Sequence, residues 1–135
     1  MPQSITQRPG DAKPEAATIL VVEDEVLIRI MISEYLREFG YNVVEAQNAA
    51  EAREILWSDE DVEVVFSDIR MPGDMNGLGL AQWIERNKPG VGVVLTSAYV
   101  PPAELAAHID TAPEIVPKPY EPKEVLSRIR AAIEA

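Results

Sequence analysis

Short apolar runs alternate with helical patterns along the whole of this chain, and that alternation restricts the possible folds more than any other feature. Apolar, mostly β-branched runs predict strands over 18–22, 41–46, 62–67, 91–96 and 114–116. Helical spacing and end signals predict helices over 26–39, 49–57, 78–87 and 103–108, and a last one beginning at 121–122. Alternation of this kind implies right-handed crossovers and a parallel sheet with helices on both faces.

Strands that are apolar along their whole length fit a sheet that is covered on both sides. We therefore expect an α/β, flavodoxin-like, doubly wound sheet of five parallel strands in the order 2-1-3-4-5, with five helices. Such a sheet has its switch point between its first and third strands, and ligands bind there, outside the carboxyl ends of the strands.

Composition limits the class of protein. A chain of 135 residues fits one domain, and we expect residues 1–16 to be a disordered lead-in because they are polar and rich in Pro, Gln and Ala. The absence of Cys excludes disulfides and thiol chemistry, and no apolar run is long enough to cross a membrane. A net charge of −11 argues against a nucleic-acid partner. With no secretory signal, we expect a cytoplasmic protein.

Acidic residues follow the two strands that flank the predicted switch point. Glu23 and Asp24 come directly after the first strand, and Asp68 ends the third. An Asp at a strand end often only begins a turn, and Asp24 could also cap the next helix. Three carboxylates brought together repel one another unless a cation joins them. Their oxygens suit Mg²⁺, or Mn²⁺ in its place.

Two further polar residues belong to the same edge of the sheet. Thr96 ends the fourth strand, and Lys118 follows the fifth. A hydroxyl and an ammonium beside a metal-bound carboxylate are the groups that a phosphoryl site needs. Each residue has an ordinary structural explanation when taken alone. Their occurrence together at the ends of four strands favours phosphoryl chemistry.

The motifs Val21–Glu25, Asp68–Pro72, Leu95–Ala98 and Pro117–Pro119 resemble those of the receiver domain of two-component response regulators. The resemblance covers residues 17–135. It implies that Asp68 accepts a phosphoryl group from a histidine kinase or a histidine phosphotransfer protein. It further implies that Glu23, Asp24, Asp68 and the backbone carbonyl of Arg70 hold the metal, that Thr96 and Lys118 contact the phosphoryl group, and that the Lys118–Pro119 bond is cis.

By the same resemblance the chain catalyses only its own phosphorylation and dephosphorylation, and it signals by binding a downstream protein, as a monomer or weak dimer. The chain ends at Ala135, directly after the last predicted helix, so we expect a stand-alone receiver. A receiver segment of a hybrid histidine kinase or a larger regulator is the alternative. An aspartyl-nucleophile phosphatase fits less well, because its general acid would be expected where Arg70 lies. A flavin-binding module would need a phosphate loop where Glu23–Glu25 lies.

The chain departs from the usual receiver pattern at several positions. The loop over 73–77 is one residue longer than the commonest form, and Ile115 replaces the usual aromatic on the fifth strand. We therefore expect a switch in which Thr96 responds to phosphorylation and Tyr99, rather than Ile115, provides the moving aromatic. The alternative is that Ile115 is only a buried strand residue and that signalling goes entirely through the first predicted helix. Receivers often control the attack of water on the phosphoryl group through the side chains two residues after the phosphoacceptor and two residues after the Thr. Here these are Arg70 and Ala98, which offer no carboxylate or amide to orient the water, so the resemblance predicts a moderately long-lived phosphoryl group.

The first predicted helix is more apolar than its inner face requires. Ile28, Ile32, Leu36 and Phe39 fall at helical spacing and form the expected inner stripe. Val26, Leu27 and Ile30 are also apolar and lie near the acidic pair. Because exposed apolar patches mark partner surfaces, we expect these three residues to bind the phosphodonor; packing beneath loops is the alternative.

Overall fold

Five strands and four helices make up the part of the chain that the structure, a computed structural model, describes: residues 16–97 and 114–134. The strands are β1 Thr18–Val22, β2 Asn42–Ala46, β3 Val62–Asp68, β4 Gly92–Ser97 and β5 Glu114–Pro117. The helices are α1 Val26–Glu38, α2 Ala49–Trp57, α3 Gly77–Asn87 and α5 Pro122–Glu134. The helix predicted over 103–108 lies outside the described residues. None of the described helices combines the length and the apolar character needed to span a bilayer.

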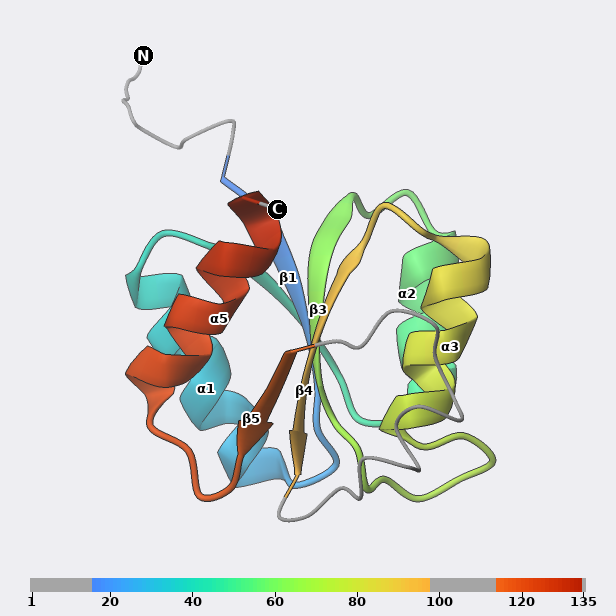
Figure 1. The fold of residues 1–135 in the computed structure, drawn as a ribbon, viewed down its shortest axis with the longest axis horizontal. Helices are drawn as coiled ribbons and strands as arrows, with labels where there is room; N and C mark the ends of the chain where they lie inside the picture. Colours follow the sequence, from blue (N-terminus) through green and yellow to red (C-terminus); the bar gives the residue numbers. More distant parts are fainter. Residues whose placement is uncertain (1–15, 98–113, 135) are drawn as a thin grey trace.

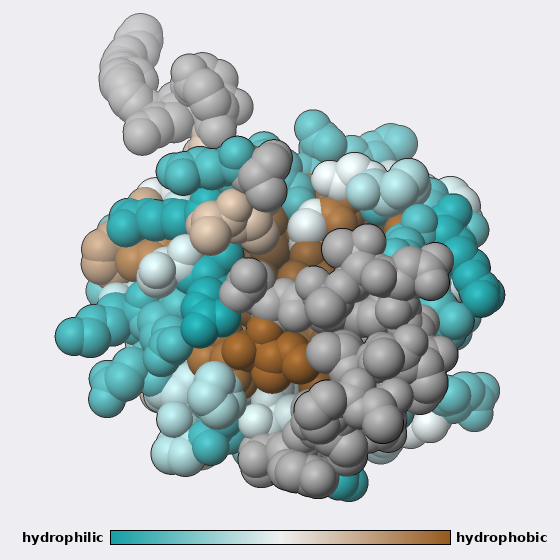
Figure 2. Space-filling model, viewed as in Figure 1, coloured by the Kyte–Doolittle hydropathy of each residue, from teal (hydrophilic) through white to brown (hydrophobic). Residues whose placement is uncertain are grey.

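The strands form one parallel sheet in the order β2-β1-β3-β4-β5, as the alternation predicted. Helices α1 and α5 cover one face, and α2 and α3 cover the other (Figure 1). Space filling in the same view shows hydrophilic residues around the rim and hydrophobic residues gathered at the centre, over β4 and β5 (Figure 2). The order places β1 beside β3, so the switch point lies where expected.

Each face of the sheet contributes its own core layer, because successive strand residues point to opposite sides. Val21 and Phe66 pack with Ile32 of α1 and Ile129 of α5. On the other face, Leu20 and Val65 belong to a cluster that includes Leu56 of α2 and Leu80 and Ile84 of α3. Strands buried on both faces must be apolar throughout, which explains why the sequence runs are continuous and do not alternate.

Local signals set several of the helix ends. Asn48 Oδ1 accepts a hydrogen bond from the Glu51 amide at 2.8 Å, which confirms the predicted cap of α2. Gly40 has a φ of 95°, as a glycine just past a helix end allows. The alternative role of Asp24 as a helix cap is wrong, because α1 begins at Val26 and its cap residue is Glu25, which makes no side-chain capping bond.

The inner stripe predicted for α1 is right at its centre and wrong at its end. Ile32 and Leu36 are fully buried, and Ile28 is partly buried. Phe39 is 48% exposed, because it follows the last helical turn and no longer points along the inner stripe. Its ring instead packs against Tyr35, with centroids 5.0 Å apart, and lies beneath the guanidinium of Arg130.

Candidate functional site

Three carboxylates meet at the carboxyl ends of β1 and β3. Glu23, Asp24 and Asp68 each present an oxygen within 4.8 Å of the others. Glu23 and Asp68 are buried, whereas Asp24 is exposed. The neighbouring positions of β1 and β3 bring together residues that are 44 positions apart in the chain (68 − 24). The cluster predicted from the sequence is therefore present.

Asp68 is held by contacts to both of its carboxylate oxygens. Lys118 Nζ donates to Oδ2 at 2.6 Å, and the Arg70 amide donates to Oδ1 at 3.1 Å. Lys118 reaches Asp68 from the loop after β5, where its own amide bonds to the Ser97 carbonyl at 3.1 Å and the Lys118–Pro119 bond is cis. Partial burial alone would lower the pKa of the Lys118 ammonium. The hydrogen bond and attraction to Asp68, aided by Glu23 and Glu25, outweigh burial, so the pKa is raised.

Thr96 is buried directly beside Asp68 in the strand register. Its hydroxyl is not bonded to Asp68: Oγ1 donates to the Val116 carbonyl on β5 at 2.8 Å. The structure therefore brings Thr96 to the site but turns its hydroxyl toward β5. For Thr96 to donate to a phosphoryl group, its hydroxyl proton would have to leave the Val116 carbonyl.

The Glu23 carboxyl has a raised pKa. The pKa of its carboxyl is raised to about 7, chiefly by burial and also by repulsion from Asp68. A hydrogen bond from the Glu25 amide to Oε2 at 3.1 Å and the positive charge of Lys118 act in the opposite direction and lower the pKa. Burial, more than the neighbouring charges, is what raises the pKa of this carboxyl.

The cluster fits a hard divalent cation. All its donors are oxygens, they converge from the loop after β1 and from the last residue of β3, and the exposed Asp24 leaves one side open to water. Glu23, Asp24 and Asp68 are the carboxylates that would hold Mg²⁺ or Mn²⁺. The Arg70 backbone belongs to the same loop as Asp68, and the role of its carbonyl as a ligand stays a prediction.

The predicted partner surface is exposed. Val26, Leu27 and Ile30 are 54%, 81% and 45% exposed, and Met31, at 50%, extends the patch. The alternative, that these side chains pack beneath loops, is wrong for the described structure. What binds the patch stays a prediction.

Of the two switch residues predicted besides Thr96, the structure describes only one. Ile115 is half-buried and packs against the cluster of Ile69, Leu78 and Leu95. Tyr99 lies outside the described residues, as does Ala98.

Three residues at the site were missed by sequence reasoning. Gly77 lies against the backbone of Asp68 and Ile69, and its amide donates to the Ile69 carbonyl at 2.8 Å. Arg29 bonds to the Glu23 carbonyl at 2.8 Å. Tyr120 has a buried hydroxyl with no partner among the described residues, and burial and then Glu23 and Asp68 raise its pKa to about 12. A basic residue one turn after an acidic pair was the available signal for Arg29.

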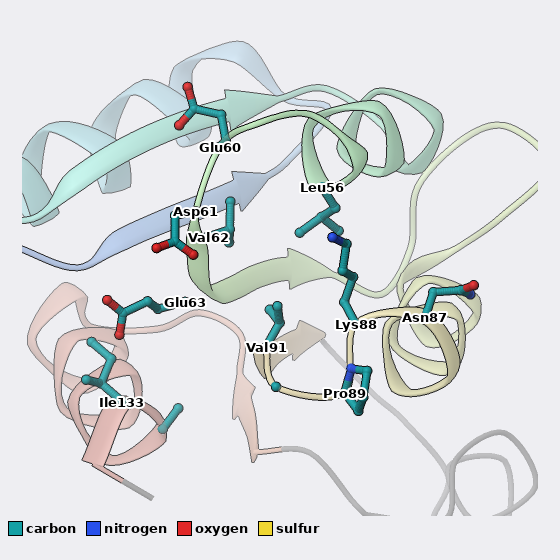
Figure 3. A pocket seen from close by; sticks show the side chains of 12 residues that line it. Leu56, Glu60, Asp61, Val62, Glu63, Asn87, Lys88, Pro89, Val91 and Ile133 are labelled. Carbon is teal, nitrogen blue, oxygen red and sulfur yellow. The ribbon is translucent and has the colours of Figure 1, made fainter.

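A cavity of about 520 Å³ lies at the amino ends of β3 and β4, opposite the strand ends that carry the carboxylates (Figure 3). Its lining includes Val62 and Glu63 at the start of β3, Lys88 and Val91 before β4, and Ile133 of α5. Val62 and Asp68 are the two ends of β3, about 20 Å apart at the rise of an extended strand. The cavity is therefore separate from the carboxylate cluster.

Comparisons with known proteins agree with this geometry. A model of the response regulator receiver domain family matches residues 19–130. The chain is 33% identical to protein PetR of Rhodobacter capsulatus over 116 residues, which are 85% of this chain and 48% of PetR. It is 35% identical to a cyclic di-GMP phosphodiesterase of Thermotoga maritima over 82 residues, 61% of this chain and 21% of that protein. The chain thus spans half or less of the length of these relatives.

Solved structures also match over nearly the whole chain. A response regulator receiver protein from Sinorhizobium medicae superimposes with a TM-score of 0.81 at 25% identity, covering 90% of this chain and 97% of that one. The non-phosphorylated receiver domain of HemR from Leptospira biflexa gives 0.76 at 29% identity, covering 88% and 95%.

Proposed function

This chain belongs to the response regulator receiver family, and on that premise we propose that Asp68 accepts a phosphoryl group from a phosphohistidine. The donor is a histidine kinase or a histidine phosphotransfer protein, and the reaction needs Mg²⁺ or Mn²⁺. One observation carries the proposal: the Asp68 carboxylate lies within the acidic cluster and is paired with Lys118 at 2.6 Å. This arrangement supports the proposal, because a nucleophile, a metal site and a phosphate-binding cation would then act side by side.

The transfer step is a displacement at phosphorus. A carboxylate oxygen of Asp68 forms a bond to phosphorus while the bond from phosphorus to the histidine nitrogen breaks, and the electron pair returns to the imidazole. Lys118, which donates to Asp68 Oδ2 at 2.6 Å, would move this hydrogen bond to a phosphoryl oxygen. Thr96 would turn its hydroxyl from Val116 toward the same group.

The metal would be held by Glu23, Asp24, Asp68 and the Arg70 carbonyl. When bound it supplies positive charge against both the carboxylates and the phosphoryl oxygens. The geometry supports a cation here, because three carboxylates within 4.8 Å of one another repel, and a bound cation would relieve that repulsion.

We further propose that output goes through protein binding. The exposed patch of Val26, Leu27, Ile30 and Met31, beside the acidic pair, would bind the phosphodonor. Thr96, Tyr99 and the loop over 97–100 would carry the switch toward a downstream protein. The stand-alone arrangement, as a cytoplasmic monomer or weak dimer, is part of the same proposal. The mass and oligomeric state of the protein in its own cells would test that arrangement.

Intact-mass measurement tests the transfer step. The protein is incubated with acetyl phosphate and Mg²⁺, and we expect one added phosphoryl group that Asp68→Asn and EDTA both abolish. Asp24→Asn should bind the metal more weakly and therefore need a higher Mg²⁺ concentration for the same reaction, because it removes a charged ligand. Phosphorylation of Asp68→Asn to the same extent, or full reaction in EDTA, would refute the assignment.

A further inference from the structure

The backbone of Glu23 is fastened on both sides. Its amide donates to the Ala46 carbonyl at the end of β2, at 3.0 Å, and its carbonyl accepts a hydrogen bond from Arg29 Nη1 at 2.8 Å. Arg29 lies one turn inside α1, and helical side chains point back toward the start of their helix, which explains how it reaches the preceding loop. This loop carries both Glu23 and Asp24.

Arg29 is itself held in place by Glu45 on β2. Arg29 Nε donates to Glu45 Oε1 at 3.2 Å, and the two side chains are only 17% and 27% exposed. Glu45 lies between Val44 and Ala46, which belong to the core on the other face of the sheet, so strand alternation turns Glu45 toward α1. A second arginine, Arg37, donates to the other oxygen of Glu45 at 3.1 Å.

We infer that Arg29, oriented by Glu45, is a positioning residue for the divalent-metal site, a role that rests on the proposed metal binding at Glu23, Asp24 and Asp68. Arg29 acts through the backbone of Glu23: it fixes the loop from which two of the three carboxylates project. A guanidinium serves this role because it donates in one plane to the Glu23 carbonyl and the Glu45 carboxylate at once.

Repulsion gives this fastening its importance. The three carboxylates lie within 4.8 Å of one another, and Lys118 pairs with only one of them, Asp68, so a loose loop would let Glu23 and Asp24 move away from Asp68. Metal binding would then have to bring them together again. The outer hydrogen-bond partners of a metal site typically change its affinity by about 10–100-fold, and we expect about tenfold for Arg29 because it acts through a backbone atom.

Manganese binding, followed by the electron paramagnetic resonance signal of free Mn²⁺, measures this effect on the whole protein. Arg29→Gln should raise the Mn²⁺ dissociation constant about tenfold, Arg29→Lys less, and Glu45→Gln by an intermediate amount. The matched control is Arg37→Gln, which loses its bonds to Glu34, Glu45 and the Val43 carbonyl but does not touch Glu23. It should bind Mn²⁺ like the wild type.

Phosphorylation by acetyl phosphate at saturating Mn²⁺ gives a second measurement. If Arg29 only positions the metal loop, Arg29→Gln should then react at close to the wild-type rate. Equal Mn²⁺ affinities of Arg29→Gln and wild type, or equal losses in Arg29→Gln and Arg37→Gln, would overturn the inference. Wild-type protein that binds no Mn²⁺ would instead overturn the metal site itself. If Arg29→Gln does not fold, Arg29→Lys and Glu45→Gln decide the question.

Discussion

Adding one methyl group at Gly77 should disturb the phosphoacceptor itself. Gly77 is the first residue of α3, and a Cβ there would lie 2.7 Å from the Ile69 Cα and deep inside contact distance of the Asp68 carbonyl oxygen. Ordinary van der Waals contact begins near 3.4 Å, so the methyl group is about 0.7 Å too close to Ile69 alone. Both obstructing groups are backbone atoms, which cannot rotate away.

The expected loss of stability follows from these overlaps. Overpacking costs about 1–3 kcal/mol, and an obstacle made of backbone places Gly77→Ala at the upper end. Replacing glycine by alanine in a helix returns about 0.5–1 kcal/mol, so the net destabilisation is about 2 kcal/mol. That amounts to a fall in Tm of about 8 °C for a domain of this size. Because the Asp68 backbone must shift, phosphorylation by acetyl phosphate should slow by about tenfold or more.

Gly79→Ala is the matched control in the same helix. A Cβ at Gly79 would meet Met75 Cγ at 2.9 Å, the end of a flexible side chain that can move aside. It should therefore be neutral or slightly stabilising and leave the phosphorylation rate unchanged. Thermal unfolding and intact-mass kinetics of both variants check the reasoning. A Gly77→Ala protein with wild-type Tm and rate would refute it, and a loss of Tm without a loss of rate would show that α3 takes up the displacement.

Three further predictions follow from the site and its surroundings. In metal-free protein the pKa of Glu23 is about 7 in the folded state against an ordinary 4.5, so its protonated form stabilises the fold below about pH 4.5 and this contribution is lost as pH rises to about 7. Urea unfolding in EDTA at about pH 5.5 and about pH 8 should show about 2 kcal/mol of this loss in wild type relative to Glu23→Gln, and no difference between the proteins would contradict it. Ile30→Lys should slow phosphotransfer from the cognate kinase while acetyl phosphate still reacts normally; a parallel fall in both rates would show a structural role. On beryllofluoride binding, NMR shifts should change strongly at residues 97–100 and little at Ile115. Changes confined to Asp68 and the metal ligands would exclude a switch in the loop over 97–100.

Patterns that repeat along the chain were readable from the sequence. The burial of the central strands β1, β3 and β4 on both faces leaves continuous apolar runs, and Asn48 and Gly40 mark helix ends through local chemistry. Phe39 shows the limit of such reasoning. It continues the spacing of Ile32 and Leu36, yet the helix ends one residue before it, and its ring finds Tyr35 and Arg130 on the surface. A residue at a helix end can follow the periodicity of the helix without sharing its face.

The sequence by itself determined the alternation of elements, and the predicted order 2-1-3-4-5, which the structure confirms, makes the ends of β1 and β3 neighbours, so that Glu23, Asp24 and Asp68 meet. Only the tertiary structure decided how those groups are held. Arg29 reaches Glu23 across a turn, Glu45 approaches from another strand, and Gly77 packs against the Asp68 backbone from a helix that follows a long loop. Such contacts form only when elements far apart in the chain are spaced correctly to within a few tenths of an ångström. No periodicity in the sequence encodes that spacing.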